Sequence, residues 1–437
     1  MQTLHIGFDD TDSRKGMCTT YLAYKIVNDL KKSDVEFLDY PRLVRFNPNI
    51  PWKTRGNGAV GISIRAKHPE RIKKLVKDSV TKYSDIKNGA NPGLVFLQGD
   101  KIPKFLFDLS ETAMYKLIHR NSVRKFYGKN KLEIFNLGNG QGLVGALGVI
   151  GYRFSDHTFE LLSYRTKQKF GSKRIVEKSL VKNMHEKTSK NTFNSYDLEN
   201  DSVLITPNGP DPVFYGIRGE DPKSVISASK MLAHSEKLDG YMIFKTNQGT
   251  GDHLKNEIDT EKFQPYTSGT IKGIVSSVPI IEKGGHVFFM LNTKGKEIRC
   301  GVYKPTQITH VAKNLTIGDT VYIGGGVRKA SRKYSRVFNI EFLHIKKLVV
   351  VKKLKNPFCK KCKKHMKSEG RNQGFRCIRC GKKAYEKNSE IISRQIKTGL
   401  YIPTTSAHRH LTRPKERLLK KNSSIKLSKN IEWINTF

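Results

Sequence analysis

Two Cys-x-x-Cys pairs near the end of the sequence carry its most specific chemical signal. Cys359 and Cys362 form one pair, Cys377 and Cys380 form the other, and fourteen residues separate the pairs. Four thiolates with this spacing are typical of a structural zinc ribbon, in which the tetrahedral metal has no open position for a substrate. Two disulfides are the alternative, but nothing in the sequence indicates secretion, and inside cells thiols stay reduced. We therefore expect a zinc module that binds rather than catalyses.

An acidic turn follows the first apolar segment. Asp9, Asp10 and Asp12 lie within four residues, shortly after Gly7, in a chain poor in acidic residues. Such carboxylates repel one another unless a cation neutralises them, and Mg²⁺ bound to nucleotide phosphates is a cation of this kind. Gly7 allows a close approach to the strand, which makes it a candidate for nucleotide binding. The alternative is a solvated turn in which Asp12 or Ser13 caps the next helix.

Hydroxyl groups mark the start of the helix that follows this turn. Thr19 and Thr20 stand where free backbone N–H groups stabilise anions. Thr19 is therefore a candidate to contact a phosphate or to accept one. Stabilisation of the helix start by the two hydroxyls explains the pattern equally well.

The segment from Pro41 to Gly58 is a second candidate for phosphate binding. It combines a short strand with a loop rich in Pro and Gly that presents Lys53 and Arg55, and Arg42 lies on the strand. Cations held on a rigid loop bind phosphates well. An ordinary basic hairpin is the alternative.

A glycine-rich run extends from Gly138 to Gly148. It matches neither a Walker nor a Rossmann pattern, so Gly142 is only a candidate for close approach to a nucleotide, and a flexible hairpin leading into a strand over 143–154 is the simpler interpretation. Two later loops carry Asp211 and Asp252 after predicted strands. These carboxylates are weak candidates for binding a cationic substrate.

The order of predicted elements indicates an α+β chain with several domains. An apolar strand over 4–8, a helix over 16–30, strands over 35–46 and 59–64, a helix over 69–83 and a strand over 94–97 give the order βαββαβ, which is ferredoxin-like. A second α/β unit follows. Five short strands between residues 269 and 348 then favour an OB-fold β-barrel, with any small barrel or sandwich as the alternative. The fold class is thus ferredoxin-like α/β units, an OB fold and a C-terminal zinc ribbon.

The charge balance points to a polyanionic partner. The 437 residues contain 80 Lys and Arg against 39 Asp and Glu, a formal net charge of +41. Residues 346–437 alone hold 26 Lys and Arg against 5 Asp and Glu, so the C-terminal fifth is a basic module. No apolar run is long enough to span a membrane, and no signal peptide is recognised at the start. We expect a cytoplasmic protein without membrane contact, with a tail that is partly disordered from Thr404 onward.

These motifs together resemble one family over nearly the whole chain. The sequence is similar to the archaeal tRNA-Ile 2-agmatinylcytidine synthetases in these segments: Gly7–Ser13, Gly16–Leu22, Pro41–Gly58, Gly140–Gly148, Glu160–Arg165, Val213–Gly219 and the four-cysteine ribbon. The resemblance implies domains over residues 1–112 (a kinase-like domain for ATP and cytidine), 113–265 (ferredoxin-like), 266–350 (OB fold), 351–385 (zinc ribbon) and 386–437 (basic tail).

The resemblance also implies a reaction. A member of this family cleaves ATP to AMP and two phosphates and uses one phosphate to activate carbon 2 of the wobble cytidine in the minor isoleucine tRNA through its oxygen. Agmatine then displaces that phosphate, so that the anticodon reads AUA rather than AUG. The enzyme also autophosphorylates a threonine that corresponds to Thr19. ATP, Mg²⁺, structural Zn²⁺, agmatine and isoleucine tRNA are the implied ligands, and no protein partner is expected. The alternative function is a non-catalytic RNA- or single-stranded-DNA-binding protein.

Overall fold

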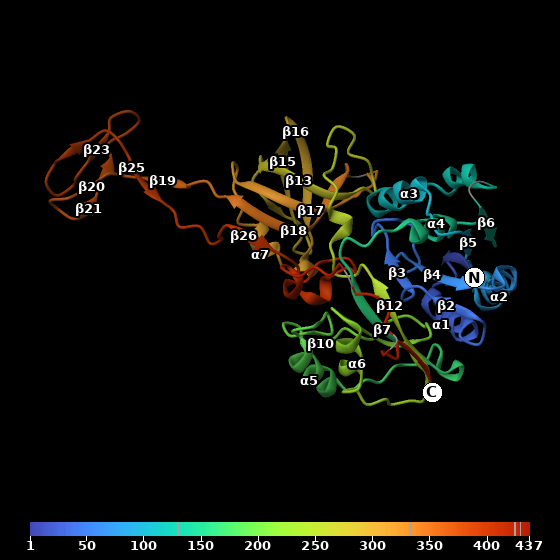
Figure 1. Cartoon of the computed structure of the whole chain (residues 1–437). Helices are drawn as coiled ribbons and strands as arrows, with labels where there is room; N and C mark the ends of the chain where they lie inside the picture. Colours follow the sequence, from blue (N-terminus) through green and yellow to red (C-terminus); the bar gives the residue numbers. More distant parts are fainter. Residues whose placement is uncertain (129–130, 333, 424, 429) are drawn as a thin grey trace.

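The computed structural model describes residues 1–128, 131–332, 334–423, 425–428 and 430–437. One 11-stranded sheet, a β-barrel and a projecting zinc ribbon make up the molecule (Figure 1). In the part of the chain that the structure describes, no helix has both the length and the apolar character needed to cross a bilayer.

The first α/β unit has the predicted ferredoxin-like order. Its elements are β1 (Gln2–Asp9), α1 (Thr19–Leu30), β2 (Val35–Phe37), β3 (Arg42–Arg45), β4 (Gly58–Ala66), α2 (Pro69–Tyr83), β5 (Gly93–Gln98), α3 (Lys104–Tyr115) and β6 (Leu132–Asn136). The strands lie in the order β6-β5-β1-β4-β3. Leu4, Ile6 and Phe8 alternate along β1 and are fully buried in a core shared with α1 and α2. This alternation confirms the period-2 pattern that predicted the strand.

The glycine-rich run continues into a helix, so the predicted strand over 143–154 is wrong. Helix α4 (Leu143–Gly151) begins directly after Gly142 and packs on β1, β4 and α3. A β-carbon at Gly151 would lie 2.0 Å from the carbonyl oxygen of Leu106, so glycine is required for the close contact with α3. The helix is apolar on all sides because it is buried, and a helix without a polar face shows no 3.6-residue period in its sequence.

The second α/β unit repeats this topology. Its elements are β7 (Thr158–Arg165), α5 (Lys178–Thr188), β8 (Thr192–Phe193), β9 (Tyr196–Asp197), β10 (Ser202–Val203), β11 (Val213–Gly219), α6 (Pro222–Ser229) and β12 (Leu238–Thr246). The strand order β12-β7-β11-β8 is again ferredoxin-like. β12 pairs in parallel with β3, Lys245 opposite Arg42 and Thr246 opposite Leu43, and this pairing joins the two units into one sheet.

The domain division remains a proposal, because the two units interpenetrate. The predicted boundary between residues 112 and 113 falls inside α3. Helix α4, which belongs to the second predicted domain in sequence, packs against the first unit. The short strand β27 (Ile434–Thr436) at the end of the chain also pairs with β12.

The five predicted strands between residues 269 and 348 form a closed barrel. The elements are β13 (Ser268–Val275), β14 (Ile280–Ile281), β15 (Val287–Thr293), β16 (Lys296–Val302), α7 (Thr309–Ala312), β17 (Thr320–Arg328), β18 (Val337–Lys347) and, paired with β18, β26 (Gly399–Tyr401). The strands follow the order β13-β17-β18-β16-β15, and pairing of β13 with β15 closes the barrel. Inward residues such as Val275, Leu291 and Val321 are fully buried. The prediction of an OB-type barrel is confirmed.

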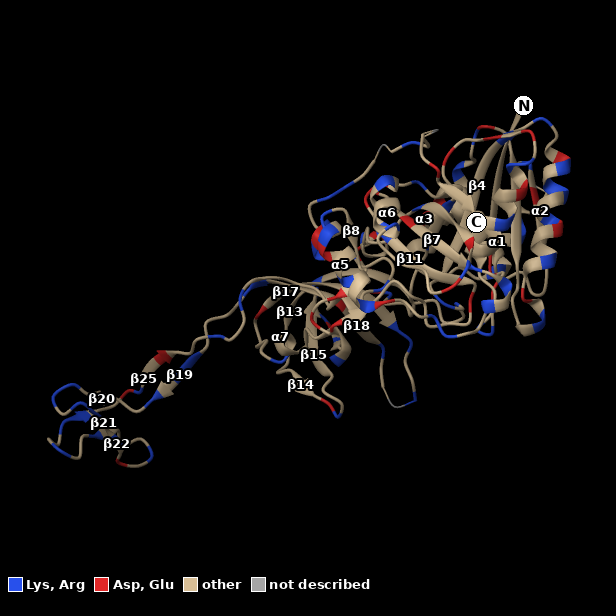
Figure 2. Ribbon diagram, turned by 90° about the horizontal axis from the view of Figure 1, so that it is seen from below, with Lys and Arg blue, Asp and Glu red and all other residues tan. Residues whose placement is uncertain are grey.

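The zinc ribbon lies at the end of a two-stranded stalk. Strands β19 (Lys352–Lys355) and β25 (Asn388–Ile391) pair to form the stalk, and β20 (Phe358–Cys359), β21 (Lys364–His365), β22 (Lys367–Ser368), β23 (Phe375–Arg376) and β24 (Lys383–Ala384) form the ribbon. Many of its residues are Lys or Arg, and few are Asp or Glu (Figure 2). Its small core contains Met366 and Phe375 beside the cysteines.

The described residues of the tail after Thr404 pack mainly against the second unit, whereas the sequence predicted partial disorder there. Arg417 is fully buried and pairs with Asp156 and Glu220 at 3.1 and 2.7 Å. A polar, basic segment looks solvated in the sequence, but here buried carboxylates of the second unit compensate its charge. Ser424 and Lys429, which this expectation also covers, lie outside the described residues.

Candidate active site

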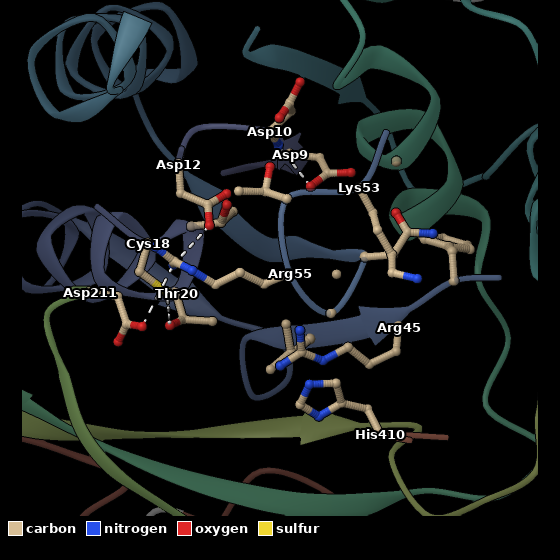
Figure 3. A pocket seen from close by; sticks show the side chains of 18 of the residues that line it. Asp9, Asp10, Asp12, Cys18, Thr20, Arg45, Lys53, Arg55, Asp211 and His410 are labelled. Carbon is tan, nitrogen blue, oxygen red and sulfur yellow. Dashed lines mark hydrogen bonds and ion pairs between the residues drawn. The ribbon is translucent and has the colours of Figure 1, made fainter. Parts of the chain in front are cut away.

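A cavity of about 610 Å³ lies where the first unit, the second unit and the tail meet. The acidic turn after β1 lies on one side of it, and Arg45 of β3 and His410 of the tail lie on the other (Figure 3). The loop after β3 and the loop before β11 complete the wall. Chain segments far apart in the sequence therefore form one site.

The acidic turn presents three carboxylates to this cavity. Asp10 adopts the left-handed conformation (φ 56°), and its N–H donates to Asp9 Oδ1 at 2.7 Å. Burial, assisted by the charge of Asp12, raises the pKa of Asp10 to about 7. Burial raises the pKa of Asp12 to about 6, although Arg55 opposes the effect, and burial and Asp10 raise the pKa of Asp9 well above its usual range. The three carboxylates therefore repel one another when ionised, and a bound cation would reduce that repulsion.

The three carboxylates do not form a closed metal cage. Among the described residues, the only group of three or more ligating side chains arranged around one point is that of the four cysteines. The Asp10 carboxylate is directed away from that of Asp12 (Figure 3). Mg²⁺ in phosphate-transfer sites takes only one or two carboxylates and completes its shell with water and phosphate oxygens, so the turn fits a cation that arrives with a nucleotide.

Arg55 connects the two units across the cavity. Its Nη1 donates to Asp12 Oδ2 and to the carbonyl oxygen of Met17, both at 2.9 Å, and lies 3.8 Å from Asp211 Oδ2. Nη2 donates to the carbonyl oxygen of Ser13 at 3.0 Å. This predicted phosphate ligand thus also positions the acidic turn.

Lys53 lies in the cavity wall on a loop that the barrel supports. Its ammonium donates to the carbonyl oxygen of Pro48, and burial and Arg409 lower its pKa. Asn47 Nδ2 donates to the carbonyl oxygen of Tyr266 at 2.7 Å, and Asn49 Nδ2 donates to Ser268 Oγ at 2.8 Å. The OB fold therefore helps to hold the loop that presents Lys53.

Thr19 lies in the cavity wall at the first position of α1. Its side-chain oxygen accepts a hydrogen bond from Thr11 Oγ1 at 3.0 Å. Burial raises the pKa of the neighbouring Cys18 thiol, so that side chain stays neutral. A hydroxyl at a helix N-terminus in a cavity with carboxylates and cations is well placed to meet a phosphoryl group.

Three predicted binding residues lie outside the cavity wall. Arg42 points to the other face of β3, where its guanidinium lies 5.2 Å from the centre of the Phe154 ring. A β-carbon at Gly7 would lie 2.1 Å from the carbonyl oxygen of Ala146, and one at Gly142 would lie 2.3 Å from the carbonyl oxygen of Asp9. Gly7 and Gly142 therefore allow α4 to approach β1 rather than a ligand to approach the backbone. Of the two weak carboxylate candidates, Asp211 lines the cavity and Asp252 does not.

The cavity wall also contains residues that the sequence patterns did not predict as site residues. Among them are Arg45, Glu160, Arg218 and His410. Alternation along β3 places Arg45 on the face opposite Arg42, so a choice of the correct face would have found it. Glu160 and Arg218 pair at 2.9 Å across neighbouring strands β7 and β11. No local signal indicates His410, because only the folded tail brings it here.

Models of three domains of one family match the chain: the TiaS TCKD domain over residues 5–72, the TiaS FLD domain over residues 140–253, and the TiaS C-terminal zinc ribbon domain over residues 356–396. A curated protein of Cenarchaeum symbiosum (strain A), the tRNA-Ile 2-agmatinylcytidine synthetase TiaS, is 46% identical over 434 residues, which are 99% of this chain and 97% of that protein. This chain belongs to the TiaS family.

Solved TiaS structures share the fold over their full length. The crystal structure of a TiaS complex with isoleucine tRNA and ATP has a TM-score of 0.87 and 33% identity and covers 98% of this chain and 100% of that one. A TiaS complex with isoleucine tRNA, AMPCPP and agmatine has a TM-score of 0.85 at 31% identity, with coverages of 98% and 100%. The curated TiaS of Methanosarcina acetivorans is 37% identical to this chain, and the alignment covers 94% of this chain and 97% of that protein.

The TiaS zinc ribbon of this chain has a donor set that fits Zn²⁺. The ligand atoms of its four cysteines all lie within 4.8 Å of one another, and the sulfur atoms of Cys359 and Cys380 are 3.6 Å apart. Tetrahedral zinc requires sulfur atoms about 3.8 Å apart. Backbone N–H groups of Cys380 and Arg379 lower the pKa of Cys377 to about 6, which favours the thiolate that zinc needs.

Proposed function

We propose that this chain is an ATP-dependent ligase that replaces the oxygen at carbon 2 of the wobble cytidine of the minor isoleucine tRNA with agmatine. The product, 2-agmatinylcytidine, allows the anticodon to decode AUA. ATP is cleaved to AMP and two phosphates, and one phosphate activates the cytidine. The proposed substrates are ATP, agmatine and this isoleucine tRNA, and no further protein takes part.

The observation that carries this function is agreement over the whole chain. Relatives named as 2-agmatinylcytidine synthetases of isoleucine tRNA align with 99% and 94% of this chain, and the cavity of this chain contains carboxylates and cations of the kind that the reaction needs. A carbonyl oxygen is a poor leaving group, and phosphorylation makes it a good one. Such a reaction needs carboxylates that hold a cation and cationic side chains that hold phosphate side by side.

The cavity residues divide this work between them. The proposed catalytic residues Asp9, Asp10 and Asp12 would supply the one or two carboxylate ligands of the cation that arrives with the nucleotide, and Lys53 and Arg55 face its phosphates. Mg²⁺, when bound there, neutralises negative charge that develops on the phosphate oxygens. Arg55 holds Asp12 in place, so its contribution is orientation as well as charge.

Thr19 and Asp211 supply the remaining proposed roles. As the family resemblance implies, the Thr19 hydroxyl accepts a phosphoryl group from ATP. Thr19 lies beside the acidic turn, where the phosphates of ATP bind in this proposal. Agmatine carries two positive charges, and Asp211 is a cavity carboxylate that can receive its guanidinium. The Asp211 carboxyl is 3.2 Å from Arg174 Nη2, so agmatine would share this acid with a resident cation.

The OB fold and the ribbon hold the tRNA in this proposal. The ribbon is rich in Lys and Arg, and it stands on its stalk away from the 11-stranded sheet (Figures 1 and 2). Such a module gains affinity from phosphate contacts at a distance from the modified base. The proposal includes a cytoplasmic location, since the ribbon thiolates need reducing conditions.

The deciding experiment follows labelled ATP. Purified protein is incubated with Mg²⁺, agmatine and a transcript of the minor isoleucine tRNA, and the control transcript has uridine at the wobble position. AMP that forms only with cytidine, together with incorporation of labelled agmatine, is the expected result. Formation of ADP alone, or tight tRNA binding without ATP cleavage, would overturn the assignment.

The non-catalytic alternative explains less. A protein that only binds a polyanion gains nothing from three partly buried carboxylates in this cavity, because they repel phosphate. It also leaves the ion pair between Arg55 and Asp12, which orders that cavity, without a role.

A further inference from the structure

His410 of the tail lies in the cavity wall, and backbone hydrogen bonds hold its segment in place. The N–H of Gly249 donates to the carbonyl oxygen of His410 at 2.9 Å, and the N–H of Gly251 donates to that of Leu411 at 2.8 Å. The imidazole lies on the opposite side of the cavity from the acidic turn, next to Arg45 (Figure 3). No step described above uses this ring.

A chain of hydrogen bonds decides which ring nitrogen carries the proton. Gln248 Nε2 donates to Glu160 Oε2 at 2.5 Å, which orients the amide so that its oxygen faces His410. That oxygen lies 2.8 Å from His410 Nδ1 and can only accept, so Nδ1 is the protonated nitrogen. Arg218 Nη2 lies farther from Nδ1, at 3.4 Å, and competes only weakly. Nε2 therefore keeps its lone pair, and among the residues that the structure describes, none forms a hydrogen bond with it.

The charges around the ring keep it neutral. Burial, and then the cations Arg45, Arg218 and Lys53, lower the pKa of His410 well below its usual range. A neutral imidazole with Nδ1–H engaged can only accept a hydrogen bond through Nε2. The same three cations disfavour a positively charged donor at this point. The site is therefore built for a neutral N–H or O–H group.

We propose that His410 Nε2 accepts a hydrogen bond from the exocyclic 4-amino group of the wobble cytosine and so distinguishes cytosine from uracil. This inference rests on the proposed function. Uracil has a carbonyl oxygen in place of the amino group, and two acceptors facing each other would leave both unpaired. Agmatine arrives as a dication, which the three neighbouring cations disfavour at this point, and the phosphates of ATP offer no donor.

The location of His410 favours cytosine over the 6-amino group of adenine. A second cavity of about 450 Å³ adjoins the first and shares Arg45, Lys53, Arg218 and His410 with it. The tail segment 405–411 lines this basic annex, and Arg55 lines it too, but Asp9, Asp10 and Asp12 of the acidic turn, which holds the nucleotide in our proposal, are not part of its wall. A polynucleotide entering through the annex brings its base to His410 before it reaches the carboxylates.

The test removes the amino group from the substrate and the imidazole from the enzyme. An isoleucine tRNA transcript carrying pyrimidin-2-one at the wobble position keeps the carbonyl at carbon 2 but lacks the 4-amino group. With wild-type protein we expect kcat/KM for AMP formation to fall about 100-fold relative to cytidine, because the acceptor is left unpaired. With His410→Ala we expect the two transcripts to differ by less than about threefold, since the partner of the amino group is gone.

Two further variants separate recognition from folding. Gln248→Leu keeps the imidazole but no longer dictates its tautomer, so its preference for cytidine should be intermediate. His68→Gln changes an exposed histidine before α2, outside the cavity, and should retain the full preference. Because the preference is a ratio within each variant, a uniform loss of folded protein does not alter it.

A second comparison tests adenine as the partner. Each protein is also assayed with ATP and with the triphosphate of purine riboside, which lacks the 6-amino group. If the His410→Ala substitution removes the preference for ATP and leaves the preference for cytidine, the assignment to cytosine is wrong. Equal penalties for pyrimidin-2-one in wild type and His410→Ala would also overturn it. If wild-type protein fails to modify cytidine at all, the proposed function itself fails instead.

Discussion

Arg55 and Asp12 form an ion pair of 2.9 Å that joins the basic loop after β3 to the acidic turn after β1. The same guanidinium lies 3.8 Å from Asp211 of the second unit. A single side chain thus holds together a loop, a turn and the neighbouring unit around the cavity. Removal of Arg55 therefore takes away one charge and also the contacts that hold the loop, the turn and the second unit in place, so the effect on activity should exceed that of the charge alone.

Replacement of Arg55 should therefore impair catalysis strongly. We expect Arg55→Ala to reduce turnover by about 10² to 10³, a loss typical of a preorganised charge in an active site. Arg55→Lys should rescue little of it, because an ammonium cannot make the divergent contacts of a guanidinium. The measurement is single-turnover formation of AMP. Arg65→Ala, which removes an exposed pair with Glu36, is the control and should behave as wild type.

Asp10→Asn should abolish turnover and leave tRNA affinity almost unchanged. The substitution removes one charge from the proposed cation site but keeps the size of the side chain and lies away from the basic ribbon. Turnover and tRNA binding are measured in parallel, with the exposed Asp29→Asn as a control. Normal turnover by Asp10→Asn would remove this residue from the catalytic site.

Loss of one ribbon cysteine should cost both metal and tRNA affinity. Cys377→Ser removes one of four thiolates, and a structural zinc site does not hold its metal with three. Elemental analysis should show about one zinc per chain in the wild type and almost none in the variant. The tRNA dissociation constant at physiological salt should rise, and its salt dependence should become weaker. Ser368→Ala on the exposed strand β22 should keep zinc, and unchanged tRNA binding by Cys377→Ser would show that the ribbon is not a tRNA contact.

Glu341 should make stability depend on pH in the acid range. Although burial raises its pKa, Arg409 and then His253 more than offset the effect and lower it to about 2. A carboxyl with a lowered pKa in the folded state stabilises the protein above its unfolded pKa of about 4.5, and this contribution is lost as the pH falls toward 2. The full contribution is about 3 kcal/mol, from 1.36 kcal/mol per pKa unit.

Denaturant unfolding of Glu341→Gln tests this expectation. The variant should have a lower free energy of unfolding than the wild type at pH 7, and the difference should shrink steadily between pH 4.5 and pH 3. The exposed Glu297→Gln on β16 should show a difference of less than about 0.5 kcal/mol at pH 7. A difference for Glu341→Gln that stays constant with pH would show that lost packing, rather than the ion pairs, causes the destabilisation.

Local sequence patterns correctly predicted those elements whose structure depends on residues close to one another in the sequence. The alternation of Leu4, Ile6 and Phe8 predicted β1, the spacing of the cysteines predicted the ribbon, and turn residues between apolar runs predicted the barrel. The same approach failed at α4, where burial on all sides removes the polar face by which a helix is recognised. It also chose Arg42 instead of Arg45, because both faces of β3 are covered and either arginine looks suitable.

The sequence by itself determined the chemistry available, namely an acidic turn, basic loops and a zinc-binding ribbon on a basic chain. Only the tertiary structure decided how these groups combine, because parallel pairing of β12 with β3 creates the cavity between the units. The return of the tail then places His410 beside Gln248, 162 positions away in sequence. Contacts over such separations arise from the packing of whole elements, and no short stretch of sequence encodes them.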